Sequence, residues 1–122
     1  MNAINWFEIP VEDMERATRF YEALLGQPLR RENFMDVPHA IFKSSKDGDG
    51  VGGALIQQRG RKPGGEGTVV YLHSNDIDAA LKRALEIGGS VSQPRTSIGP
   101  MGSVAQVKDT EGNLVGLHTP PG

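Results

Sequence analysis

Residues 4–26 of the chain read INWFEIPVEDMERATRFYEALLG, and residues 67–89 read GTVVYLHSNDIDAALKRALEIGG. Each stretch has an alternating segment, an aspartate, and then an amphipathic helical pattern that ends at a glycine. A shift of 63 residues places Asp13 on Asp76 and Gly26 on Gly89. This duplication predicts two similar modules whose equivalent strands surround a shared interior, and we expect the functional site there.

The two predicted helices share the same start and stop signals. Asp13 and Asp76 are good N-caps, Gly26 is suited to the left-handed residue that ends a helix, and Gly88 or Gly89 provides the second stop. Apolar residues form one stripe along each helix. The stripes consist of Met14, Ala17, Phe20, Tyr21, Leu24 and Leu25, and of Ile77, Ala80, Leu81, Ala84 and Leu85.

Three short strand candidates follow each helix, around residues 29–33, 40–44 and 53–58 and around 90–93, 103–108 and 114–119. The order of elements is therefore βαβββ, written twice. It predicts an α+β fold in which two tandem βαβββ modules form curved mixed sheets around a cavity, with the helices on the outer face. The modules cover about residues 1–60 and 67–120 of a single domain, 1–122.

Composition excludes several functional classes. The net charge of −2 gives no electrostatic reason to expect nucleic acid or an anionic membrane surface as a partner. The chain has no cysteine, which removes disulfides, thiolate catalysis and cysteine-bound metals. No apolar run approaches the roughly 20 residues that span a bilayer, and no signal-peptide pattern is present, so we expect a cytoplasmic protein.

Alternation within the strands separates two faces of each sheet. Ile9, Leu72 and Leu117 belong to aliphatic rows that suit packing against helices. The opposite rows carry polar and aromatic side chains. These are Trp6, Glu8, Tyr71, His73 and His118, and we expect them to face the cavity.

The repeated βαβββ pattern, the IPVEDMERATRFY segment of residues 9–21 and the closing DTEGNLVGLH of residues 109–118 resemble the vicinal oxygen chelate superfamily. That superfamily includes glyoxalase, bleomycin-resistance proteins and extradiol dioxygenases. The resemblance covers essentially the whole chain. It implies the fold given above and, as in many members, a homodimer whose pocket lies within one chain or between two.

The metal enzymes of that superfamily hold a divalent ion with one ligand from each of four strands. The resemblance places these four positions at Trp6, Ala54, Val69 and Gly116, with a less certain register for Ala54. None of the four side chains can bind a metal ion. We therefore expect no metal cofactor, and do not transfer the metal-dependent activities of the family.

Two interpretations of the remaining polar residues stay open. Glu8, His73 and His118 have the composition of many two-histidine-one-carboxylate iron sites, or could move a proton without a metal. Alternatively, they are polar wall residues of a ligand pocket. Tyr71 and Gln58 could donate a hydrogen bond to a developing oxyanion.

At Trp6 a large flat side chain stands where the metal enzymes of the family have a small metal-binding residue. Trp6 therefore either stacks on a planar small molecule or fills the space of the absent metal site. Ala54 and Gly116 leave room opposite it in both cases. Met101 either lines the mouth of the pocket or packs under a loop. Arg59, Arg61 and Lys62 form a basic patch in the linker, either solvated or closing over an anionic ligand.

Residues 48–53 match the pattern GxGxxG, but a strand follows them where nucleotide binding requires a helix, so they predict a hairpin loop. A calcium loop at Asp47 is excluded because Gln58 replaces the closing glutamate. The sequence as a whole predicts a metal-free protein that binds a small molecule. The alternative is a metal-independent or unusually ligated lyase or isomerase that uses Glu8, His73 and His118.

Overall fold

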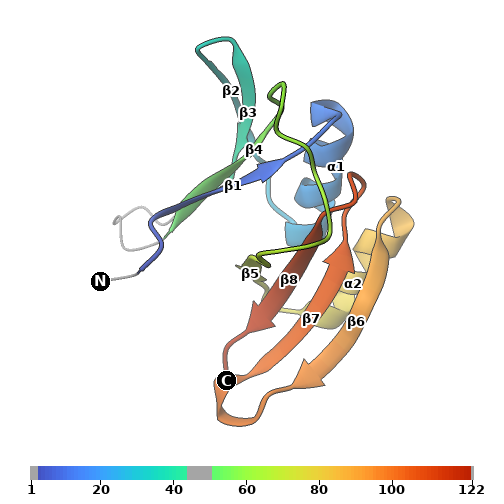
Figure 1. Cartoon of the computed structure of the whole chain (residues 1–122). Coiled ribbons are helices and arrows are strands. Elements are labelled where there is room, and N and C mark those ends of the chain that lie inside the picture. The colour runs from blue at the N-terminus through green and yellow to red at the C-terminus, as the bar shows by residue number, and fades with distance from the viewer. Residues whose placement is uncertain (1–2, 44–50, 122) are drawn as a thin grey trace.

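The computed structural model describes residues 3–43 and 51–121 (Figure 1). The first module contains β1 (Trp6–Pro10), α1 (Met14–Leu25), β2 (Arg30–Phe34), β3 (Val37–Ile41) and β4 (Gly52–Ile56). The second contains β5 (Tyr71–His73), α2 (Ile77–Glu86), β6 (Ser90–Ser97), a short 3-10 turn (Gly99–Met101), β7 (Ser103–Lys108) and β8 (Leu114–Thr119). The tandem βαβββ order predicted from the sequence is confirmed.

Each module forms one mixed four-stranded sheet. The strand orders are β1-β4-β3-β2 and β5-β8-β7-β6, and the pairs β1–β4 and β5–β8 are parallel. Strands β1 and β5 are therefore edge strands of their sheets. Within the described residues the two sheets are not hydrogen-bonded to each other, so they do not close into one wall around a shared interior.

Both helix starts are capped as the sequence predicts. The Asp13 side chain accepts a hydrogen bond from the Arg16 N–H at 3.0 Å, and that of Asp76 accepts one from the Ala79 N–H at 3.1 Å. Gly26 ends α1 with a φ of 67°, in the left-handed region. Helix α2 ends at Glu86, just before the predicted glycine stop.

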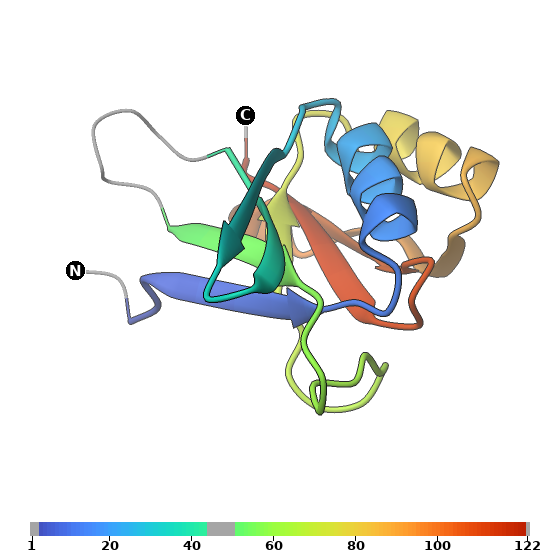
Figure 2. The same ribbon diagram turned by 90° about the horizontal axis from the view of Figure 1, so that it is seen from above.

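The helices share one hydrophobic core with the aliphatic faces of both sheets, and they lie side by side (Figure 2). Arg83 of α2 joins them because its guanidinium donates hydrogen bonds to the carbonyl oxygens of Ala23 and Leu24, at 2.6 and 3.2 Å. These carbonyls lie at the end of α1, where backbone acceptors lack partners within the helix. Ile9, Leu72 and Leu117 are buried in this core, as the alternation predicts.

The turn between β7 and β8, residues 109–113 and below called the β7–β8 turn, connects the second module to the first. The Tyr21 hydroxyl donates a 2.6 Å hydrogen bond to the Asp109 carboxylate, and both residues are buried. Burial, with the neighbouring Asp109 carboxylate, raises the pKa of Tyr21 well above its usual value. Asn113 donates to the Pro10 carbonyl oxygen at 2.8 Å, which fixes the end of β1 against β8.

Glu111 in the same turn satisfies the start of α1. Its carboxylate accepts backbone N–H groups of Glu12 and Asp13, both at 2.9 Å, and an Arg16 N–H at 2.7 Å. Burial alone would raise the pKa of Glu111, but the hydrogen bonds from Arg16, the backbone and Thr110 outweigh burial and lower the pKa to about 2. A carboxylate at this position also interacts favourably with the helix dipole.

Two details differ from the prediction. Strand β3 begins at Val37, three residues before the predicted strand, because Met35 and Asp36 form a tight turn with φ values of 52° and 64°. Leu85, assigned to the buried stripe of α2, is 58% exposed. Part of the 48–53 stretch predicted as a hairpin loop lies outside the described residues, as does the calcium-loop candidate at Asp47.

No described helix has both the length and the apolar character that crossing a membrane requires.

Candidate functional site

The face of each sheet that points away from the helices carries most of the predicted site residues. Trp6 and Glu8 lie in the exposed row of β1, whereas Ile9 of the alternate row is buried in the shared core. In the second sheet, Tyr71 pairs with Gly116 and His73 pairs with His118 along the parallel strands β5 and β8. The predicted residues are thus divided between two separate sheets.

Trp6 is held in place although its side chain is exposed. The indole ring lies over Gly52 of β4, where an added Cβ would come within 3.1 Å of it. The indole N–H donates to the Glu8 carboxylate at 3.2 Å, and Arg61 of the linker forms an ion pair with Glu8 at 3.3 Å. Trp6 remains 46% exposed, so one face of a fixed aromatic ring is open to a ligand.

Tyr71 has an equivalent setting in the second sheet. Its ring lies on Gly116 of β8, where a Cβ would approach the ring to 2.2 Å. The Tyr71 hydroxyl accepts a hydrogen bond from the Gln106 amide at 2.8 Å, which fixes the outer end of the ring. Tyr71 is 44% exposed. In both modules, therefore, an exposed aromatic ring packs against a glycine of the neighbouring strand.

The two histidines on this face are neighbours with separate hydrogen bonds. His73 Nε2 lies 2.8 Å from the Asn75 side-chain oxygen, and His118 Nε2 lies 2.7 Å from the Met101 carbonyl oxygen. Because a carbonyl oxygen only accepts, His118 Nε2 carries a proton, and in the tautomer with a single ring N–H the free acceptor nitrogen is Nδ1. Glu8 belongs to the other sheet. Among the described residues no group of three His, Asp or Glu side chains could hold a metal ion, so Glu8, His73 and His118 form no such group within the chain.

The other predicted site residues have different surroundings. Ala54 is completely buried beside Glu8 in the β1–β4 pair, whereas Met101 is 64% exposed. Gln58 is exposed and follows β4, and Val69 is half-buried before β5. The third histidine, His39, lies in β3 of the first sheet, packs edge-on against Phe34 with ring centroids 4.9 Å apart, and has Nδ1 2.8 Å from the Val37 carbonyl oxygen.

Two cavities adjoin the edge strands β1 and β5. The smaller, about 450 Å³, is lined by Trp6, Glu8 and Lys62 together with parts of the linker and β8. The larger, about 600 Å³, is lined by Val69, Tyr71 and His73 and by the residues that precede and follow them. Ala54, Gln58, Met101, Gly116 and His118 line neither cavity, so the chain does not bring all the predicted residues into one pocket.

Several residues of the larger cavity were missed by the sequence analysis. Phe7, Leu24 and Phe42 belong to the aliphatic and helical core pattern, and Arg83 has the appearance of a solvated basic residue in the last turn of a helix. They meet because the modules pack through their helices. A pattern within one module carries no signal for that contact.

The model for the Glyoxalase/Bleomycin resistance protein/Dioxygenase superfamily matches residues 3–117. The chain belongs to this superfamily. The match includes both βαβββ modules and the β7–β8 turn, so the family likeness inferred from the repeated motif is confirmed.

Relatives of known sequence extend the comparison. A glyoxylase-like domain-containing protein of the fungus Didymella fabae is 26% identical over 121 residues, which cover 98% of this chain and 94% of that protein. The protein CFP32 of Mycobacterium bovis is 25% identical over 115 residues, covering 93% of this chain. The chain spans only 44% of the length of CFP32.

Solved structures share the fold. TnmS3, an antibiotic binding protein from Streptomyces sp. CB03234, superposes with a TM-score of 0.69 at 26% identity, covering 99% of this chain and 98% of that one. A maize glyoxalase I variant superposes with a TM-score of 0.71 at 21% identity, covering 93% of this chain and 44% of that one. The second likeness is one of fold.

At the four positions that the resemblance assigns to the metal ligands, the residues present do not fit a divalent ion. Indole, methyl, isopropyl and hydrogen stand at Trp6, Ala54, Val69 and Gly116, and none offers the nitrogen or oxygen lone pair that a divalent ion requires. Ala54 is also completely buried, and the Tyr71 ring covers Gly116. We therefore derive no chemistry through a metal ion for this chain.

Proposed function

We propose that the protein binds a planar, aromatic small molecule without a metal ion, by stacking the ligand on Trp6 and Tyr71. The observation that carries this proposal is the repeated arrangement of an exposed aromatic ring on a glycine of the adjacent strand. Each module contributes one such ring on the face opposite its helix. Stacking between aromatic rings stabilises a complex by about 0.5–1.5 kcal/mol beyond the burial of area.

Hydrogen bonds at the polar end of each ring support this role. The indole N–H is bonded to Glu8 and the Tyr71 hydroxyl to Gln106, so neither ring needs to lose much rotational freedom when a ligand arrives. A preorganised surface keeps more of its interaction energy as affinity. Glu8 and Arg61, which form an ion pair beside Trp6, would provide polar contacts at the edge of the ligand.

The comparisons support binding as the common property. TnmS3 is an antibiotic binding protein and resembles this chain over nearly its whole length. Bleomycin resistance proteins give their name to the superfamily. A planar antibiotic-like molecule is therefore the ligand class that we propose. In keeping with the metal-free proposal, protein purified without chelators should contain far less than one metal ion per chain, and stoichiometric metal would contradict it.

We further propose that the protein acts as a cytoplasmic homodimer. In the part of the chain that the structure describes, strands β1 and β5 each have an unpaired edge, and the two sheets that carry Trp6 and Tyr71 do not close on each other. A second copy that covers these faces would enclose a ligand between two aromatic surfaces. Sedimentation equilibrium should give a mass near twice 13.1 kDa, and a monomer at micromolar concentration would contradict the dimer.

A thermal-shift screen tests the binding proposal. Bleomycin and a panel of planar polycyclic compounds serve as probes, and a ligand at 100 times its Kd should add about 2.7 kcal/mol to the free energy of unfolding. Trp6→Ala should weaken binding about tenfold or more. Phe34→Ala is the matched control because Phe34 is similarly exposed, at 48%, but lines neither cavity. Equal binding by both variants would remove Trp6 from the site.

A second candidate function rests on the paired histidines. His73 and His118 are register partners, and the free Nδ1 of His118 could accept a proton from a bound substrate, as a lyase or isomerase requires. A ligand found in the screen should then incorporate solvent deuterium, and His118→Ala should abolish the incorporation. Incorporation that persists in His118→Ala would exclude His118 as the base.

A further inference from the structure

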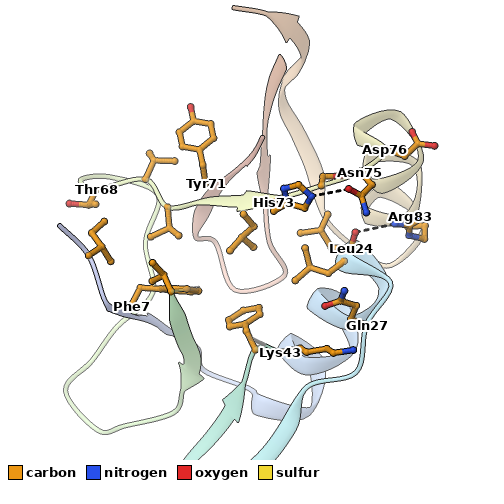
Figure 3. Close-up of a pocket in the computed structure, with 18 residues that line it drawn as sticks. Phe7, Leu24, Gln27, Lys43, Thr68, Tyr71, His73, Asn75, Asp76 and Arg83 are labelled. Carbon is orange, nitrogen blue, oxygen red and sulfur yellow. Dashed lines mark hydrogen bonds between the residues drawn. The ribbon is translucent and has the colours of Figure 1, made fainter. Parts of the chain in front are cut away.

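We infer that the larger cavity is a second binding site, for a small anionic molecule with an apolar body such as a medium-chain carboxylate. The cavity lies between the modules, on the helix side of the sheets, whereas Trp6 and Tyr71 project from the opposite faces. Figure 3 shows the Tyr71 ring pointing away from the cavity, although Tyr71 is among the residues that line it. The cavity volume of about 600 Å³ lies in the range of small-molecule sites.

Much of the cavity lining is apolar. The Phe7 and Leu24 side chains lie on opposite sides of the cavity in Figure 3, and Phe42, Leu25 and Leu72 complete the apolar lining. These residues are already packed in the core: Leu24 is 1% exposed and Phe42 is 7% exposed. The wall is therefore largely formed before a ligand enters, which lowers the cost of binding.

The side of the cavity across from Phe7 also carries polar and positively charged groups. Gln27, Lys43 and Arg83 lie along it in Figure 3. Arg83 is fixed in position by its hydrogen bonds to the carbonyl oxygens of Ala23 and Leu24. Among the described residues that line the cavity Asp76 is the one carboxylate, but it points outward in Figure 3 and accepts the N–H of Ala79 as a helix cap. Charge complementarity thus favours an anionic head group near Lys43 and an apolar body toward Phe7.

Calorimetric titration with dodecanoate below its micellar concentration tests this inference. The wild-type protein should bind one molecule per chain. Lys43→Ala should weaken binding about two- to five-fold, as expected for one exposed ion pair. Lys82→Ala is the matched control, because Lys82 is an exposed lysine of α2 that lines neither cavity. Dodecanol, which lacks the charge, should bind equally well to the wild type and to Lys43→Ala.

Two further variants separate this site from the proposed stacking site. Leu25→Trp, which adds a bulky ring to the apolar lining of the cavity, should abolish dodecanoate binding, and Trp6→Ala should leave it unchanged. The inference is overturned if the wild type does not bind dodecanoate, if Lys43→Ala and Lys82→Ala bind alike, or if Trp6→Ala weakens binding. Affinity that falls as the protein concentration rises would also overturn it, by indicating that a second copy of the chain occupies the cavity.

Discussion

Replacing Tyr21 by phenylalanine should remove one strong hydrogen bond between the modules and leave the packing of the core intact. The Tyr21 ring is completely buried and packs edge-on against Phe20 and Phe42, with ring centroids 5.1 and 5.7 Å away. Phenylalanine keeps these contacts. The lost interaction is the 2.6 Å hydrogen bond from the Tyr21 hydroxyl to the Asp109 carboxylate.

The size of the effect follows from what remains around Asp109. Its carboxylate still accepts the backbone N–H groups of Glu111 and Asn113, both at 2.8 Å, and the Asn113 amide at 3.0 Å. The carboxylate therefore stays partly satisfied, and the loss should be that of one hydrogen bond to a charged group, about 1.5–3 kcal/mol. For a chain of this length the melting temperature should fall by roughly 6–12 °C.

Urea unfolding followed by far-ultraviolet circular dichroism measures this difference. Tyr71→Phe is the matched control, because Tyr71 also has a bonded hydroxyl but is 44% exposed, and should change stability by less than about 0.5 kcal/mol. If Tyr21→Phe destabilises no more than Tyr71→Phe, the hydrogen bond does not hold the modules together and the reasoning is wrong.

The pH dependence gives an independent check on the same residue. The pKa of Tyr21 is raised in the folded protein, so the folded state retains this proton at pH values where the unfolded state has lost it. The contribution of the protonated Tyr21 hydroxyl to the free energy of unfolding is complete below the unfolded pKa of about 10. This contribution is lost as the pH rises from that value toward the folded pKa of Tyr21. Tyr21→Phe should lack this part of the alkaline decline.

Three further predictions concern other contacts. Glu111→Gln should destabilise the protein by roughly 1–3 kcal/mol. Because the folded pKa of Glu111 is lowered, the wild type should lose stability as the pH falls from 4.5 to about 2, and the variant should lack this loss. An unchanged acid unfolding profile would contradict this. Gly116→Ala should tilt the Tyr71 ring and weaken ligand binding in the thermal-shift assay. Full affinity would show that binding does not depend on packing of the Tyr71 ring against a glycine. Gly102→Ala should lower the free energy of unfolding, measured in urea, by more than about 2 kcal/mol, because the residue has a φ of 104° and its Cβ would clash with the Thr119 carbonyl oxygen. A smaller change would mean that the backbone of this turn can rearrange at little cost.

Local patterns in the sequence predict the elements of the fold well. Both aspartate caps, the left-handed Gly26 and the division of β1 into a buried and an exposed row are confirmed. These features depend on residues a few positions apart, where propensity and periodicity act directly. Met35 shows the limit of this approach, because it has a positive φ although methionine, unlike the neighbouring Asp36, is not a residue that commonly marks such a turn.

The packing of the two modules could not be predicted in the same way. Arg83 bonds to carbonyls about 60 residues away in the chain, and Glu111 contacts Arg16 across 95 residues. Neither pair is marked by spacing or composition. For this reason the sequence predicts the aromatic and polar face around Trp6 and Tyr71 but not the larger cavity, whose walls exist only where the modules meet.

The β7–β8 turn has a consequence for how the chain is made. Glu111 supplies hydrogen-bond acceptors to the start of α1, and Asp109 holds Tyr21 near its middle. During synthesis on the ribosome, α1 therefore cannot form these hydrogen bonds until residues 109–113 have been translated and have left the ribosome. An isolated N-terminal half would lack these partners, and we therefore expect the two repeats, although alike in pattern, to fold as one cooperative unit.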